Sequence, residues 1–279
     1  MNKNFIRIIP KLDIKNNNLI KGVNLEGLRA LGDPYDFAQV YSQHGADEIF
    51  YIDNVATLYG TNNLTKFVSQ TAMNLRIPLS VGGGIRSIDD ISKMLHAGAD
   101  KVSINSVLVD DINFLKKAIK IFGSSTITVI VECIKIKNRY FISKSNGRDL
   151  VNENPLDWCK KLEDFGAGEL FITSVNHEGL KNGFDIPLIK KISKKSFIPI
   201  IAHGGAGNFE HIWDVIRQTN ISGVSIAGFF HYNYLNNFKI KKNNMIGNFN
   251  FVDTAANKKK TNLIMNLKKF LKKRKVNVR

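Results

Sequence analysis

The segment SVGGGIRS at residues 80–87 returns as AHGGAGN at residues 202–208, in the second half of the chain. Two further segments are repeated in the same order, each about 121 residues later. They are HGADEIFYID (44–53) with FGAGELFITS (165–174), and AGADKVSINS (97–106) with the weaker NISGVSIAGF (220–229). Three matched words at nearly one offset indicate a chain made of two homologous halves.

The glycine-rich words also predict chemistry. A glycine-rich turn exposes backbone N–H groups, and these groups bind anions such as phosphate. Two such turns in equivalent places therefore predict two phosphate sites, and a substrate that carries a phosphate at each end.

Short apolar runs alternate with amphipathic segments, which is typical of βα units around a parallel sheet. The expected strands are 5–13, 48–53, 78–82, 101–104, 126–134, 169–174, 199–203 and 223–227, and the expected helices include 36–43, 88–96, 112–121, 156–165, 209–219 and 261–271. Four units in each half predict an α/β fold, a (β/α)8 TIM barrel made of two similar half-barrels. A doubly wound Rossmann sheet is the rival, but the G-x-G-x-x-G spacing is absent.

Size and composition favour one soluble domain. The 279 residues are 43% hydrophobic and no Pro- or Ser-rich linker divides them, so residues 1–279 are expected to form one barrel domain with an insertion at about 232–260. Only Cys133 and Cys159 are present, which fits a reducing cytoplasm without disulfides. No run of 18 apolar residues occurs, so neither a membrane span nor a signal peptide is expected.

The net charge of +16 is concentrated at one end of the chain. Residues 232–279 hold thirteen Lys or Arg and one acid, Asp253. Such runs predict a solvated helix face or a tail. A surface for RNA or an acidic partner is the alternative, but no aromatic-interleaved motif supports nucleic-acid binding.

Two carboxylates end equivalent apolar runs. Asp13 closes IRIIPKLD in the first half, and Glu132 lies in ITVIVECI, 119 residues later. Working groups of barrel enzymes lie at the carboxyl ends of strands, so the two form a candidate general acid and base pair. The alternative is two charged strand ends that pair with Lys15 and Lys135. His residues are scattered without ligand spacing, so no metal or cofactor is expected.

Loops that follow strand ends are expected on the same face. Residues 135–155 form a polar, Asn-rich loop after the fifth strand, and residues 231–260 form a longer one after the eighth. Both could cover the substrate. For the second, a tolerated surface insertion is an equal alternative.

Six segments taken in order carry a family resemblance: RIIPKLDIKNNNLIKGVNLEGLRALGDP (7–34), GADEIFYID (45–53), PLSVGGGIRS (78–87), AGADKVSINS (97–106), FGAGELFITS (165–174) and AHGGAGNFEHI (202–212). With these segments the chain resembles the cyclase subunit of imidazole glycerol phosphate synthase. A related isomerase of histidine biosynthesis is also similar, but LRALGDP favours the cyclase. The resemblance implies a lyase that takes ammonia from a partner glutaminase. It converts a bisphosphate formimino-ribonucleotide to imidazole glycerol phosphate and aminoimidazole carboxamide ribonucleotide.

The resemblance also implies roles for single residues. Asp13 and Glu132 would be the catalytic acid/base pair, and Lys21 would reach a phosphate from a flexible first loop. One phosphate site would comprise Gly84, Asn105 and Ser106, and the other Gly179, Gly205, Ala227 and Gly228. An ammonia gate at the opposite mouth would comprise Arg7, Glu48, Lys101 and Glu169, with Asp100 beside it to contact the glutaminase.

Several positions depart from the family pattern. Lys11 replaces a Cys, Glu132 replaces an Asp, His203 replaces a Ser, and residues 176–180 read Asn-His-Glu-Gly-Leu in place of Asp-Arg-Asp-Gly-Thr. A carboxylate displaced by about 1 Å can lose about a hundredfold in rate. These changes motivate an alternative function, a cyclase-like paralogue that passes ammonia to a sugar amidotransferase of surface polysaccharide synthesis.

Overall fold

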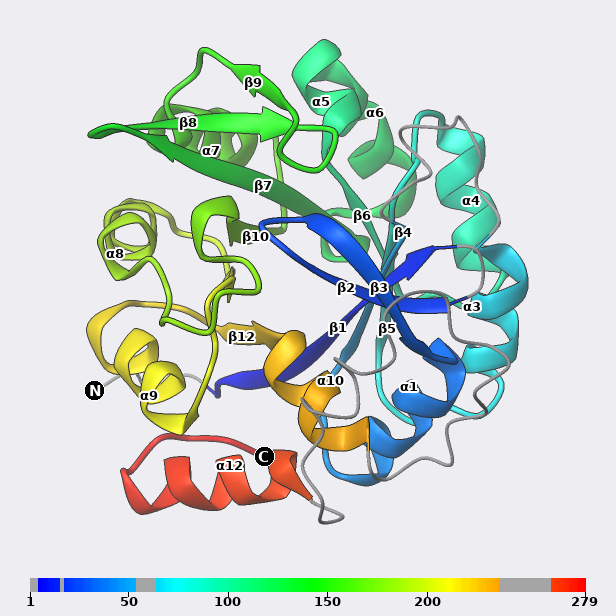
Figure 1. The fold of residues 1–279 in the computed structure, drawn as a ribbon. Coiled ribbons are helices and arrows are strands. Elements are labelled where there is room, and N and C mark those ends of the chain that lie inside the picture. Colours follow the sequence, from blue (N-terminus) through cyan, green and yellow to red (C-terminus); the bar gives the residue numbers. More distant parts are fainter. Residues whose placement is uncertain (1–4, 16–17, 54–63, 236–261) are drawn as a thin grey trace.

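The computed structural model describes residues 5–15, 18–53, 64–235 and 262–279, and in these ranges it forms a closed (β/α)8 barrel (Figure 1). The parallel strands are β1 (Arg7–Lys15), β4 (Ile49–Asp53), β5 (Leu79–Gly82), β6 (Lys101–Ile104), β7 (Ile127–Ile136), β10 (Glu169–Ser174), β11 (Ile200–His203) and β12 (Gly223–Ile226). They pair in this order, and β12 pairs with β1 to close the barrel. All eight strands lie within two residues of their predicted ranges, and the Rossmann alternative is wrong.

Helices surround the strands (Figure 1). They are α1 (Pro34–Gln43), α3 (Thr65–Ala72), α4 (Ile88–His96), α5 (Ser106–Asp110), α6 (Asn113–Phe122), α7 (Pro155–Asp164), α8 (Ile186–Lys195), α9 (Phe209–Gln218), α10 (Gly228–Tyr234) and α12 (Leu263–Lys273), with 3-10 turns η1 (Ser124–Thr126) and η2 (Val175–His177). The expected helices are all present. Within the described ranges, α3, α5, α8 and α10 are further helices for which no residue range was predicted from the sequence.

The repeated words include a helix start in each half. Ser87 Oγ accepts a hydrogen bond from Asp90 N at 3.1 Å at the start of α4, and Asn208 Oδ1 accepts one from His211 N at 2.8 Å at the start of α9. These side chains satisfy backbone N–H groups that have no partner within the helix. The two halves therefore begin the helix after the glycine turn at the same repeat position.

Each half also carries an antiparallel hairpin on its first strand. The hairpin of β2 (Asn18–Val23) and β3 (Glu26–Gly32) extends β1, and β8 (Arg139–Lys144) with β9 (Asp149–Val151) extends β7. Two expectations are therefore wrong. Residues 135–155 are largely strand rather than loop, and Lys21 lies buried on β2 rather than on a flexible loop. The ladder hydrogen bonds of β1 and β7 continue past the barrel rim and organise both segments.

Two apolar layers hold the barrel together. The larger packs the outer faces of the strands against the helices. The smaller fills the barrel interior and is formed by Ile9, Phe50, Ile52, Phe171 and Ile201, with Phe50 and Phe171 ring centroids 4.6 Å apart. The interior is a packed core, as expected for eight strands.

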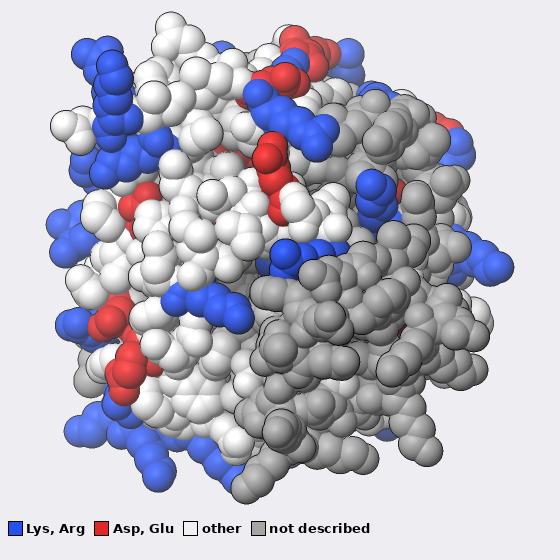
Figure 2. All heavy atoms as spheres, in the orientation of Figure 1, with Lys and Arg blue, Asp and Glu red and all other residues white. Residues whose placement is uncertain are grey.

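The basic C-terminal region is partly integrated into the fold. Lys268 of α12 is buried and pairs with Asp47 at 2.7 Å, and Arg274 pairs with Glu210 at 2.8 Å. Figure 2 shows cationic side chains at the edge and toward the middle of the described part of one face, interspersed with acidic ones. Most of the predicted insertion, at 236–260, lies outside the described residues. No helix in the described ranges is both long and apolar enough to cross a membrane.

Candidate functional site

The two glycine turns have the same conformation and the same close contact. Gly83 has φ +100° and Gly204 has φ +101°, a region that favours glycine. A Cβ on Gly83 would lie 2.3 Å from the carbonyl oxygen of Asp53, and one on Gly204 would lie 2.8 Å from that of Ser174. Asp53 and Ser174 are themselves equivalent in the repeat. The internal duplication thus extends to the backbone geometry of the site.

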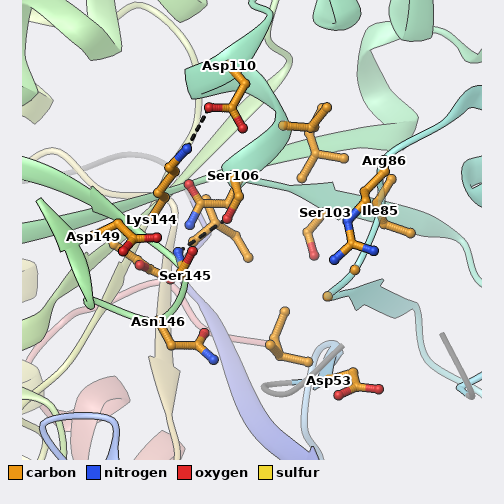
Figure 3. A pocket seen from close by; sticks show the side chains of 18 residues that line it. Asp53, Ile85, Arg86, Ser103, Ser106, Asp110, Lys144, Ser145, Asn146 and Asp149 are labelled. Carbon is orange, nitrogen blue, oxygen red and sulfur yellow. Dashed lines mark hydrogen bonds and ion pairs between the residues drawn. The ribbon is translucent and has the colours of Figure 1, made fainter. Parts of the chain in front are cut away.

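The first glycine turn opens into a cavity of about 390 Å³. Gly84, Asn105 and Ser106, predicted as one phosphate set, all line it, and so does Glu132. Figure 3 shows Lys144 reaching Asp110 on one side, at 2.5 Å, with Arg86 on the other side. The backbone N of Ser145 donates to Ser106 Oγ at 3.3 Å, so the β8–β9 hairpin forms one wall.

The second glycine turn also borders a pocket. Gly179, Gly205, Ala227 and Gly228, predicted as the other phosphate set, line it together with Lys21. This pocket has a volume of only about 10 Å³, roughly the room for a single water. The fold thus brings each predicted set to one place, but the two pockets differ greatly in size.

Asp13 is buried at the mouth between two ammonium groups. Lys11 Nζ donates to Asp13 Oδ1, and Lys21 Nζ lies 3.6 Å from Oδ2. Burial favours the neutral carboxyl, but the charges of Lys11 and Lys21 outweigh it and lower the pKa of Asp13 below its ordinary value. Asp13 is therefore ionised at neutral pH. The alternative from the sequence, an ion pair of Asp13 with Lys15, is not what the structure shows, because Asp13 pairs with Lys11 and Lys21.

Glu132 has the opposite electrostatic state. It is buried, accepts a hydrogen bond from the backbone N of Gly147 at 2.9 Å and is hydrogen bonded to the side chain of Asn105. Burial outweighs these contacts and the charge of Lys11, and raises the pKa of Glu132 to about 7. The site therefore combines an ionised carboxylate with a carboxyl group that titrates near neutrality. Such a pair suits general acid and base catalysis.

The raised pKa of Glu132 predicts a pH-dependent loss of stability. The folded state binds this proton more tightly than the unfolded state, so the free energy of unfolding falls as pH rises from about 4.5 to 7. The size of the shift corresponds to about 3 kcal/mol. Glu132→Gln lacks this titration. Urea unfolding of both proteins at pH 5 and pH 8 should show that the wild type loses about this much more than the variant. A stability difference that does not change with pH would contradict the titration.

At the opposite end of the barrel, the four predicted gate residues form one chain of ion pairs. Arg7 Nη1 lies 2.8 Å from Glu48 Oε2, Arg7 Nη2 pairs with Glu169, and Lys101 Nζ lies 2.9 Å from Glu169 Oε2. The two cations, Arg7 and Lys101, therefore match the two carboxylates, Glu48 and Glu169, in number. Asp100 Oδ2 accepts a hydrogen bond from Leu79 N at 2.8 Å, so its carboxylate also fixes the start of β5.

Sequence reasoning missed the five other charged residues that line the first pocket: Asp53, Arg86, Asp110, Lys144 and Asp149. Asp53 ends an apolar run as Asp13 does, and Arg86 lies within the glycine-rich segment SVGGGIRS, so both positions could have been identified from the sequence. Lys144 could not, because only the β8 ladder brings it there. In the part of the chain that is described, no cluster of three or more His, Cys, Asp or Glu could hold a metal ion.

Fold and site together define a two-fold repeated (β/α)8 barrel with one pocket at each glycine turn and two buried carboxylates at the same mouth. The family model described as histidine biosynthesis protein matches residues 7–236, and the chain belongs to this family. Among similar proteins are the imidazole glycerol phosphate synthase subunits HisF of Legionella pneumophila (45% identical, 74% of this chain and 97% of the relative), Staphylococcus saprophyticus (42%, 81% and 90%) and Saccharolobus solfataricus (40%, 81% and 90%).

Proposed function

We propose that the chain is the cyclase subunit of imidazole glycerol phosphate synthase. One observation carries the proposal: the two glycine-lined pockets lie at the mouth that holds Asp13 and Glu132. A substrate with a phosphate at each end spans such a mouth and presents its middle to the carboxylates. The relatives at 40–45% identity bear the same name, and none of them supports the sugar amidotransferase alternative.

The two carboxyl groups have different parts in this reaction. Asp13 is ionised and accepts a proton, whereas Glu132 carries a proton below pH 7 and donates it. Ring closure with ammonia requires proton removal from the attacking nitrogen and proton delivery to the departing group. Because the two carboxyl groups lie in opposed electrostatic environments, the same site can remove one proton and deliver another at neutral pH.

Ammonia reaches the site through the barrel from a glutaminase that docks at the opposite mouth. The ion-paired ring of Arg7, Glu48, Lys101 and Glu169 lies at that entrance. Beyond the ring the interior is apolar, lined by Ile9, Phe50 and Phe171 among others. We infer that ammonia crosses this packed apolar interior as the neutral molecule rather than as the ammonium ion, because a charge without a partner there is costly.

Lys101 is the residue of the ring that can be removed with least damage. Its side chain is 22% exposed and it contacts Glu169, which keeps Arg7 as a partner. Lys101→Ala should therefore lower glutamine-driven turnover at least tenfold and leave turnover with free ammonium salts nearly unchanged. Steady-state assays of the complex with each nitrogen source measure both rates. Equal loss of the two activities would contradict a role in ammonia transfer.

The direct test of the proposed function needs no partner. The purified chain is mixed with the bisphosphate formimino-ribonucleotide and ammonium salts, and both products are quantified. Formation of imidazole glycerol phosphate, lost in Asp13→Asn, supports the proposal. Absence of turnover by a folded wild-type protein would refute it.

A further inference from the structure

The two pockets differ at one equivalent strand position. Gly82 pairs with Ser103 in the β5–β6 ladder, and His203 pairs with Ser225 in the β11–β12 ladder. The first half has no side chain at this point, and a Cβ on Gly82 would lie 2.0 Å from Ser103 Oγ. The second half has a buried imidazole. The two halves therefore differ at this position, which borders the second pocket.

His203 is one member of a buried cluster. Its Nε2 lies 2.9 Å from Glu178 Oε2, and Glu178 Oε1 accepts a hydrogen bond from Lys21 Nζ. All three side chains are 2% exposed. Because they fill the space beside Gly205 and Gly228, only about 10 Å³ remains in the second pocket, against about 390 Å³ in the first.

The charges explain why the cluster is stable without a ligand. The imidazole of His203 and the ammonium of Lys21 outweigh the effect of burial and hold the pKa of Glu178 well below its usual range, so the residue is an anion. Lys21 in turn is shared between Glu178 and Asp13. The cation that is expected to bind the second phosphate thus already has an anionic partner from the chain itself.

We propose that the Glu178 carboxylate is an internal competitor for the second phosphate site: it occupies Lys21 and His203, and a ligand phosphate binds there only by displacing it. This inference rests on the proposed function and deepens it. Lys21 already pairs with two carboxylates, Asp13 and Glu178, so a phosphate placed beside it as a third anion would be strongly repelled while Glu178 stays in place. The first pocket, which is open, therefore captures a phosphate group before the second does.

The test uses inorganic phosphate and reads each pocket separately. Amide NMR signals of Gly84 and Ser106 report the first pocket, and those of Gly205 and Gly228 report the second. In the wild type, phosphate should perturb the first pair at concentrations at least tenfold lower than the second pair. Glu178→Gln, which keeps the shape and removes the charge, should tighten binding at the second pair at least tenfold and leave the first pair unchanged.

Matched variants isolate the displacement step. Asp110→Asn removes an equivalent charge from the first pocket and should leave the second pair unchanged. Adding Lys21→Met to Glu178→Gln should abolish the gain. Glu178→Asp, with a carboxylate that is one methylene shorter and retracts from Lys21, should give a smaller gain, and it tests the idea if the Gln variant does not fold.

Unchanged or weaker phosphate binding at the second pair in a folded Glu178→Gln protein would overturn the inference, because Glu178 would then not compete with the ligand. This result does not depend on turnover. Loss of cyclisation with ammonium salts would refute the proposed function, whereas the phosphate titration alone decides the role of Glu178.

Discussion

Asp13→Asn should lower the rate of ammonium-driven cyclisation by about 10²–10⁴-fold, the contribution of a positioned general acid or base. The substitution preserves the shape of the side chain but removes its ability to accept a proton. Asp13 lines neither pocket, and its one described contact with their residues is the 3.6 Å ion pair with Lys21, so the affinity for the bisphosphate substrate should change by only a few fold. Steady-state kinetics and calorimetric titration of the same preparations measure the two quantities.

The substitution also removes one partner from each of two buried ammonium groups, Lys11 and Lys21. Its folding therefore has to be verified by circular dichroism before the rates are compared. Asp149→Asn is the matched control, because Asp149 lines the first pocket but has no contact with either lysine in the described structure. The control should retain most of its activity. Loss of substrate binding by Asp13→Asn, in step with the rate, would make Asp13 a positioning residue instead.

Arg7→Met should produce the largest loss of stability. Arg7 joins Glu48 to Glu169, and Glu48 has no second cation among its described partners, only the hydroxyl of Ser80 at 2.5 Å. Loss of the guanidinium leaves a buried carboxylate unpaired, which costs about 3 kcal/mol, the lower end of the usual range, since Arg7 is partly exposed. In a barrel of this size the melting temperature should fall by about 6–12 °C.

Differential scanning calorimetry of Arg7→Met and of two further variants tests this expectation. Glu48→Gln in the Arg7→Met background should recover much of the loss, because it removes the unpaired charge. Lys93→Met breaks an exposed pair with Asp89 and should shift the melting temperature by about 1 °C or less. An Arg7→Met protein as stable as the wild type would show that the ring does not contribute to folding.

The fold was predictable because each repeated segment contains several local structural signals together. GGGIRS and GGAGN each combine a turn that requires glycine with the side chain that starts the next helix, Ser87 or Asn208. Apolar runs of strand length between these words fixed the number of βα units. The grouping of Gly84 with Ser106, and of Gly205 with Gly228, was implied by the family resemblance, and it agrees with the rule that strand ends meet at one mouth of a barrel.

The expectations that failed concern segments whose structure depends on distant partners. Residues 135–155 are polar and rich in turn formers, so they resemble a loop. They form strands because the ladder of β7 extends beyond the barrel and pairs with β8. Lys21 follows three asparagines and resembles a loop residue, yet it is buried because β2 continues the ladder of β1.

The sequence by itself determined the barrel, its duplication and the residues at its mouth, since these depend on local periodicity and on glycine conformations that recur at one offset. Only the tertiary structure decided which charges meet. Lys21 and Glu178 are 157 residues apart, and Arg7 and Glu169 are 162 apart. Their pairing, the pKa difference between Asp13 and Glu132 and the closure of the second pocket all arise from burial and Coulomb interaction across the barrel. These forces act through space rather than along the chain.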